Sequence, residues 1–371
     1  MRVGVHGVDG MHSKTRWMVT GALAAALLVV PRASMPTERG DRESHISNAG
    51  SASEYWDIVA DFDNGYSLFA RFMITNEGPG KRTATASWYL VDPKKKLHHF
   101  RNGRRKGSWS LSSDGRRIEI GSSLLDQSGA VHRFEYDSEK RETRIQFQFS
   151  PKGPVAWTDP PVAGNYSIDL LDLGTPITGT IQLKGMSEPV PVRGTISVAH
   201  TWMEQSEADL ALRRIEFSST GDGPSLYLSD LTTPSGERHR WLVVERDGEV
   251  IFRTTDFQLE LGDPQKQSPN DRYPTPSTLR ITAPGVEGTI RTDSVLVAVD
   301  PLDDIPQPFR FLLSLKMRPH RVWKRASFEL RLRTDPTHAE TILRGSGFTT
   351  ITFLNPLPST ITSSENGKPG V

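Results

Sequence analysis

One histidine in this sequence stands close to carboxyl and aromatic side chains that could together move a proton. His200 is followed at short spacing by Trp202 and Glu204, while Asp57 and Asp230 are carboxyl groups that a fold could bring to it. An imidazolium, or a carboxylic acid of raised pKa, can donate a proton when it lies inside an apolar cavity. We therefore predict a catalytic set of His200, Glu204 and Asp230, with Asp57 as a further carboxyl partner.

The same residues also have a structural interpretation. His200 and Trp202 could form a hydrogen-bonded pair that holds the junction between two domains and has no catalytic role. Trp56 and Trp202 also have two interpretations. They either line a ligand cavity or plug the ends of β-barrels. Together with Tyr227 and Trp241, these two tryptophans are the predicted ligand-binding residues.

The neighbouring His98 and His99 are not expected to share a metal ion, because adjacent residues of a strand point to opposite faces. A basic run of Arg101, Arg104, Arg105 and Lys106 follows closely. It forms either a patch for anionic lipid or cell-wall polymer, or a solvated rim. The sequence contains no G-x-S-x-G, no phosphate-binding glycine loop and no H-E-x-x-H. We therefore predict neither a metal ion nor a cofactor.

The composition limits the class of protein. The 45 Lys and Arg residues almost balance the 44 Asp and Glu residues, so no global field attracts nucleic acid. The absence of cysteine excludes disulfides, thiolate nucleophiles, Cys-ligated metals and a lipoprotein anchor. At 371 residues the chain exceeds what one hydrophobic core usually organises. Two soluble globular domains are expected.

Short strands, rather than helices, must position these side chains. Residues rich in β-strand propensity recur between turn signals, which is typical of an all-β barrel or sandwich. In 143–149, Ile145, Phe147 and Phe149 alternate with polar residues, which places one face on a core and the other in water. Further strands are expected at 67–74, 85–91, 108–111, 117–120, 132–136, 166–171, 179–183, 190–198, 212–217, 225–230, 240–245, 249–252, 257–261, 279–282, 288–299, 311–317, 327–333 and 342–353. The proline-rich stretches at 151–161 and 301–308 break strand ladders and are expected to be loops.

The N-terminal residues have the pattern of a targeting sequence. Lys14 and Arg16 precede an apolar run at 17–30, which is typical of a secretion signal and too short to span a bilayer comfortably. Residues 1–34 are thus a secretion signal or an uncleaved anchor of an exported or membrane-tethered protein, and membrane contact is expected only there. The remaining divisions are a flexible lead-in at 35–53, barrels at 54–199 and 200–355, and a loose tail at 356–371.

Three landmarks follow one another in order along the chain. They are Glu-Tyr-Trp-Asp at 54–57, Ala-His-Thr-Trp at 199–202 and Gly-Ser-Gly-Phe at 345–348. They resemble the acidic-aromatic start, the hinge motif and the closing strand of the lipocalin-like family of AttH and hydroxyneurosporene synthase, a carotenoid 1,2-hydratase. Lipocalin-like Diels–Alderases are related to this family in architecture. The resemblance implies an all-β fold of two tandem antiparallel lipocalin-like (calycin) β-barrels. Similar turns at 63–65 and 222–224 also favour a duplicated barrel.

The resemblance also implies a function. Such barrels, or the cleft between them, would enclose a large apolar terpenoid, polyene or polyketide and promote a cofactor-free hydration, isomerisation or cyclisation. Hydration of an alkene needs an acid to form the carbocation and a water molecule to trap it. The alternative is a non-catalytic exported lipid-binding or carrier protein. A His200 side chain that faces an apolar cavity would favour the enzyme, and a packed, hydrogen-bonded one would favour the carrier.

Overall fold

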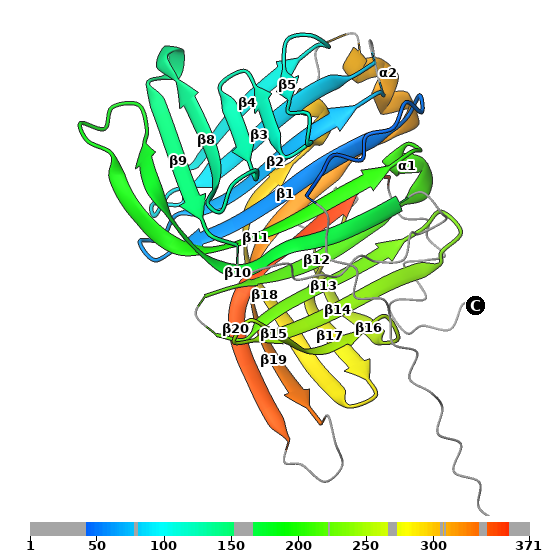
Figure 1. The fold of residues 1–371 in the computed structure, drawn as a ribbon. Helices are drawn as coiled ribbons and strands as arrows, with labels where there is room; N and C mark the ends of the chain where they lie inside the picture. Colours follow the sequence, from blue (N-terminus) through cyan, green and yellow to red (C-terminus); the bar gives the residue numbers. More distant parts are fainter. Residues whose placement is uncertain are drawn as a thin grey trace, which may run out of the picture. The chain divides into compact units, whose positions relative to one another are not determined.

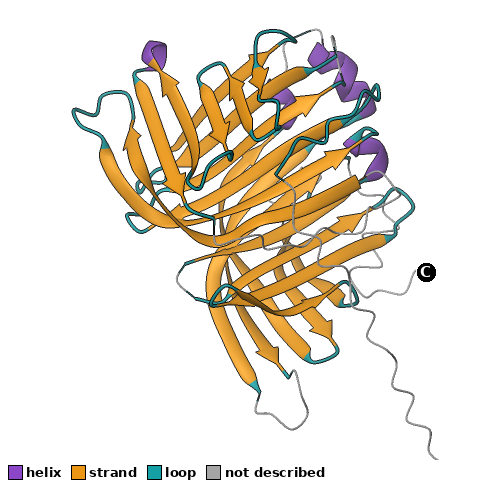
Figure 2. Cartoon of the chain, viewed as in Figure 1, coloured by secondary structure: helices purple, strands orange, loops and turns teal. Residues whose placement is uncertain are grey.

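A computed structural model describes residues 42–77, 81–151, 166–221, 223–265, 273–304, 307, 309–333 and 340–355. Antiparallel strands make up most of this part of the chain (Figure 1 and Figure 2), which confirms the predicted all-β class. The predicted signal or anchor, most of the proline-rich stretch at 151–161 and the predicted tail lie outside the described residues. Within the described ranges, no helix combines the length and apolar character needed to cross a membrane.

The first sheet contains eleven strands in the order β4-β3-β2-β1-β11-β10-β9-β8-β7-β6-β5. Its strands are β1 (Ser53–Phe62), β2 (Ser67–Thr75), β3 (Thr83–Val91), β4 (Leu97–Arg104), β5 (Ser110–Leu111), β6 (Arg117–Ile120), β7 (Ser123–Asp126), β8 (His132–Ser138), β9 (Thr143–Phe149), β10 (Tyr166–Gln182) and β11 (Val190–Met203), with the 3-10 helix η1 (Glu139–Arg141) between β8 and β9. Every neighbouring pair is antiparallel, and the first strand pairs with the last.

The second sheet contains nine strands in the order β15-β14-β13-β12-β20-β19-β18-β17-β16. Its strands are β12 (Arg213–Thr220), β13 (Ser225–Thr232), β14 (Arg238–Arg246), β15 (Glu249–Thr254), β16 (Gln258–Gln265), β17 (Thr275–Ala283), β18 (Val286–Val299), β19 (His320–Leu332) and β20 (Thr341–Phe353). The short α1 (Glu207–Leu210) connects the two sheets, and η2 (Pro301–Asp304) and α2 (Phe309–Lys316) lie between β18 and β19. The segment at 311–317, expected as a strand, is thus mainly helical.

Both sheets follow the same path. Each begins with a strand that pairs with the last strand of its own sheet, as β1 does with β11 and β12 with β20. The β1–β2 and β12–β13 connections occupy equivalent places in the two strand orders, and residue 222 of the second one lies outside the described residues. The first sheet carries two additional short strands. This shared topology supports the predicted duplication.

The interior of the first sheet holds a large apolar core. Alternate residues of β9 are buried, as predicted for Ile145, Phe147 and Phe149. Side chains link the two ends of the strand order. Asn102 on the edge strand β4 and Trp88 on β3 both donate hydrogen bonds to the hydroxyl of Ser123 on β7, two strands from the other edge, at 2.9 and 3.2 Å. The sheet is therefore curled around its core, as expected for a lipocalin-like barrel.

The boundaries at both ends of this sheet differ from the expected ones. Strand β11 continues to Met203, so the expected domain boundary at residue 200 lies inside the first sheet. The expected lead-in makes specific contacts from residue 42 onwards. Arg42 forms an ion pair of 2.9 Å with Asp172, and Ser44 donates a hydrogen bond of 2.6 Å to Glu54. Buried carboxylates on the sheet thus hold this segment in place.

His132 gives the first sheet a predicted pH dependence. Burial, together with Arg42 and Arg116, outweighs Asp126 and lowers the pKa of His132 from 6.5 to about 4. The unfolded chain binds this proton at a higher pH than the folded protein does. The free energy of unfolding therefore falls as the pH drops from the unfolded-state pKa to the folded-state pKa. We expect the wild type to lose about 2 kcal/mol more unfolding free energy between pH 6.5 and 4 than a His132→Gln variant. Urea titrations across this range would measure the difference, and parallel curves would contradict the assignment.

The second sheet encloses its own core, which includes Phe217, Leu228, Phe328 and Ile351. The outer faces of the two sheets pack against each other through other residues. In one cluster, Phe69 and Tyr89 of the first sheet meet Val297, Trp323 and Phe348 of the second. A further cluster joins β1, β10 and β11 to β13 and β14. Strands β12 and β13 are consequently buried on both faces.

A bulge in β10 brings the two sheets close together. The pairing of β10 with β11 shifts register between Leu170 and Thr175. Gly174 has a φ of 58° here, and a Cβ atom at this position would lie 2.4 Å from the hydroxyl oxygen of Ser225 on β13. Glycine therefore allows both the left-handed backbone and the close approach.

Candidate functional site

A cavity of about 760 Å³ lies between the outer faces of the two sheets. Strands β1 to β4 and β11 contribute one wall, and β12, β13, β19 and β20 contribute the other. Leu302 of η2 and Leu313 of α2 also border the cavity. Much of the lining is apolar, including Val59, Phe69 and Trp323. A volume of this size is typical of sites that enclose a small molecule.

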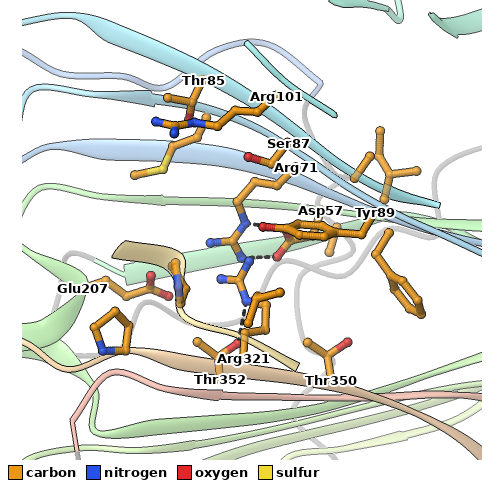
Figure 3. A pocket seen from close by; sticks show the side chains of 18 of the residues that line it. Asp57, Arg71, Thr85, Ser87, Tyr89, Arg101, Glu207, Arg321, Thr350 and Thr352 are labelled. Atoms are coloured by element: carbon orange, nitrogen blue, oxygen red, sulfur yellow. Dashed lines mark hydrogen bonds and ion pairs between the residues drawn. The ribbon is translucent and has the colours of Figure 1, made fainter. Parts of the chain in front are cut away.

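Charged side chains lie along one part of the cavity wall. Figure 3 shows Arg71 pointing toward Asp57, and its Nε donates a hydrogen bond of 2.6 Å to Asp57 Oδ1. Arg321 comes from the opposite sheet, and its Nε donates to the hydroxyl of Thr352 at 3.1 Å. Arg71 also stacks on the ring of Tyr55, with its guanidinium carbon 3.8 Å from the ring centroid.

Asp57 is the carboxylate on which these cations converge. Burial alone would raise its pKa, but Arg71, Arg321 and Arg214 outweigh burial and lower the pKa to about 2. Asp57 is therefore ionised near neutral pH. An ionised carboxylate paired with guanidinium groups is suited to positioning charge and is a poor proton donor.

Arg214 on β12 connects this charged wall to the residues behind it. Its Nη2 lies 3.1 Å from Asp57 Oδ2, and its Nη1 donates hydrogen bonds of 2.8 and 2.7 Å to the hydroxyls of Tyr55 and Tyr166. Its Nε lies 2.9 Å from Oε2 of Glu216. The Arg214 side chain is almost completely buried. One guanidinium thus holds together β1, β10 and β12.

Glu216 supplies a carboxyl group of a different kind. It lines the cavity, and the hydroxyl of Tyr227 donates a hydrogen bond of 3.0 Å to its Oε1. Burial raises the pKa of Glu216 above its usual value and outweighs the opposing effect of Arg214. A carboxyl group of raised pKa at an apolar cavity can act as a proton donor. Sequence reasoning missed Glu216, although it lies in the predicted strand at 212–217.

A group of arginines lies around another part of the cavity. Arg101, Arg104, Arg105 and Arg141 all line it, and the last three are exposed. Three of these four belong to the basic run noted in the sequence. The described residues contain no group of three or more His, Cys, Asp or Glu side chains placed to hold a metal ion.

His200 does not line this cavity. It lies on the inner side of the first sheet, where its Nε2 is 2.7 Å from Oε1 of Glu54, and both side chains are fully buried. Trp56 stacks on its ring with centroids 4.4 Å apart, and Trp202 is 5.1 Å away. Asp57, the further partner considered from the sequence, points to the opposite face of β1 from Trp56 because successive residues alternate.

The structure does not bring the other two predicted catalytic residues to His200. Glu204 is exposed just after β11. Asp230 is buried in the second sheet, where it binds Arg238 and Arg240 at 2.8 and 3.2 Å. These arginines also donate hydrogen bonds to the backbone carbonyls of Leu259 and Phe257, across the gap between β14 and β16. Asp230 therefore orients two arginines that link β14 to the edge strand β16 and to the residue before it.

The four predicted ligand-binding residues lie in different surroundings. Tyr227 lines the cavity beside Glu216. Trp241 packs against Tyr227 with centroids 5.7 Å apart but does not line the cavity. Trp56 belongs to the core of the first sheet, and Trp202 stacks on His45 with ring centroids 4.1 Å apart.

Comparison with known proteins identifies the fold. The chain is similar to a candidate AttH protein of Nitrosomonas europaea, with 14% identity, a TM-score of 0.58 and coverage of 82% of this chain and 93% of that one. It is also similar to CghA in complex with Sch210972 (11% identity, TM-score 0.58, 88% and 97% covered) and to kievitone hydratase from Nectria haematococca (11%, 0.55, 87% and 94%). No protein-family model and no curated protein sequence matches the chain.

These structures share the lipocalin-like fold with this chain over most of its length, in two tandem sheets. The resemblance drawn from the landmarks at 54–57, 199–202 and 345–348 is confirmed for the fold.

Proposed function

We propose that this protein is a cofactor-free lipocalin-like enzyme that encloses a large, mainly apolar ligand between its two sheets and transfers a proton to it. The observation that carries this proposal is the Glu216 carboxyl group, whose pKa is raised by burial in the wall of a 760 Å³ cavity. The similarity to kievitone hydratase, which is named for a hydration, supports the choice of reaction class. Residues 1–34 would act as a secretion signal or as an uncleaved N-terminal anchor.

In a hydration, Glu216 donates a proton and regains one at the end of the reaction. The Glu216 carboxyl group donates its proton to one alkene carbon, and the adjacent carbon becomes a carbocation. A water molecule adds to that carbon and returns a proton to the Glu216 carboxylate, which restores the acid. Isomerisation follows the same first step, with loss of a different carbon-bound proton in place of water addition. Tyr227 holds the Glu216 carboxyl group in place throughout.

Ligand enclosure can be tested by filling the cavity. Ser87 lines it, and Figure 3 shows its side chain among the other lining residues. A Ser87→Trp variant should bind the neutral fluorophore N-phenyl-1-naphthylamine at least about tenfold more weakly, because the indole takes the space of several ligand atoms. The matched Ser110→Trp variant changes an exposed serine that is not part of the lining and should bind like the wild type. Equal affinities for all three proteins would contradict enclosure in this cavity.

A carrier without turnover is the second candidate. The observation that favours it is the placement of His200, which is buried, hydrogen-bonded to Glu54 and outside the cavity lining. A carrier would release the compounds that co-purify with it unchanged, whereas the enzyme would convert them. Mass spectrometry of these compounds before and after incubation with fresh protein separates the two functions.

A further inference from the structure

Arg321 differs from the other guanidinium groups at the charged wall of the cavity. Arg71 pairs with Asp57, and Arg214 pairs with both Asp57 and Glu216. Arg321 has its Nε hydrogen bond to Thr352, but no carboxylate of the described residues forms an ion pair with it. Its residue surface is only 8% exposed. A buried cation without a counter-ion is unfavourable unless something else compensates its charge.

The ring of Trp323, whose centroid lies 5.6 Å from the guanidinium carbon of Arg321, faces this charge, but the nearby carboxylates are engaged by other side chains. Burial and the nearby Arg71 lower its pKa, which Asp57 and Glu207 only partly oppose. Asp57 is already engaged by two other guanidinium groups, and Glu207 accepts a 2.6 Å hydrogen bond from Tyr55. Oε2 of Glu216 lies 2.9 Å from the Nε of Arg214. Each of these three carboxylates is therefore bound to other side chains, which leaves Arg321 without a counter-ion among the described residues.

The position of Arg321 makes it accessible to a ligand. It lines the cavity, and Figure 3 shows its guanidinium between Thr352 and the Asp57–Arg71 pair. Nearby lining residues such as Trp323, Leu354 and Met317 are apolar. A guanidinium fork in an apolar cavity is suited to bind a carboxylate through two parallel hydrogen bonds.

We propose that Arg321 is an anion-binding residue of the cavity and that the ligand is an amphiphile, with a long apolar body and one carboxylate group that binds Arg321. This inference rests on the proposed function, because it needs a ligand inside the cavity. It adds a substrate class, since a purely hydrocarbon ligand would leave Arg321 uncompensated. The carboxylate also fixes the direction in which the apolar body lies relative to Glu216.

The test compares a fluorescent polyene acid, parinaric acid, with its methyl ester, which has the same body without the charge. The wild type should bind the acid about tenfold to a hundredfold more tightly than the ester. In Arg321→Gln this preference should nearly vanish through loss of acid affinity, while ester affinity stays unchanged and reports an intact cavity. Arg321→Lys keeps a charge without the fork and should retain part of the preference.

Arg325→Gln is the matched control. Arg325 lies on the same strand and face, but it pairs with Asp61 at 2.8 Å and does not line the cavity. This variant should keep the full preference for the acid. Equal binding of acid and ester by the wild type would overturn the Arg321 assignment but not the enclosure. A full preference for the acid in Arg321→Gln would also overturn it, and would indicate that arginines elsewhere on the lining bind the carboxylate. Binding of neither compound would overturn the proposed enclosure and the anion site with it.

Discussion

Turnover of the cavity's substrate is expected to fall by about 10²- to 10⁴-fold when Glu216 is replaced by Gln, because the amide cannot donate the proton that a carboxylic acid supplies. The amide oxygen still accepts the hydrogen bond from Tyr227, so ligand binding should change little. The variant should therefore co-purify with unreacted substrate. Mass spectrometry of the compounds extracted from the variant, followed by their incubation with wild-type protein, would identify the substrate and measure the rate.

A Glu260→Gln variant is the matched control for this experiment. Glu260 is exposed on β16 and does not line the cavity, so its replacement should leave turnover unchanged. If Glu216→Gln converts the substrate as fast as the wild type, Glu216 is not the proton donor. If neither protein converts any extracted compound, the carrier function is favoured.

The second large effect concerns stability. Replacement of Arg214 by Met should lower the free energy of unfolding by about 3–5 kcal/mol, because it removes one partner from a buried ion-pair network. Asp57 and Glu216 lose their shared cation, and the hydroxyls of Tyr55 and Tyr166 lose a hydrogen-bond donor. Urea unfolding at neutral pH would measure the loss.

A surface pair and a double variant calibrate the Arg214 result. Arg344→Met removes an exposed arginine that pairs with Glu329 at 2.9 Å, and it should cost less than about 1 kcal/mol. The double variant Arg214→Met with Glu216→Gln should lose less than the sum of the single variants, because the second change removes a group that the first left unpaired. Additive losses would show that the two side chains are not coupled.

Strand positions could be predicted from sequence because each strand has an inner face that must be apolar. The alternation of Ile145, Phe147 and Phe149 determines which side of β9 faces the core, and the turn residues delimit the strands. Strands β1, β4 and β7 were not among the expected strands. The 311–317 segment was expected as a strand and is as apolar as one, but it forms mainly helix α2 beside the cavity. A short apolar run does not distinguish the two structures by periodicity alone.

The site was harder to predict because it lies on outer faces. Glu216 stands between Ile215 and Phe217, and this alternation usually indicates a solvated outer side chain. Only the packing of one sheet on the other buries it. His200 could be selected from the sequence as a candidate acid by its residue type alone. Its hydrogen-bond partner could not, because Glu54 lies 146 positions away. Antiparallel pairing of β1 with β11 brings the two together, and no local spacing reveals that register.

Because the cavity lies outside the two cores, the residues that contact a ligand differ from the residues that specify the fold. Charged lining residues such as Arg71 and Arg321 occupy strand positions that alternate with those filling the two interior cores. A substitution in the lining can therefore alter ligand selectivity without opening a void in either core, which is the usual source of severe destabilisation. The scaffold can acquire new specificities by changing one face of its strands while the other face continues to specify the fold.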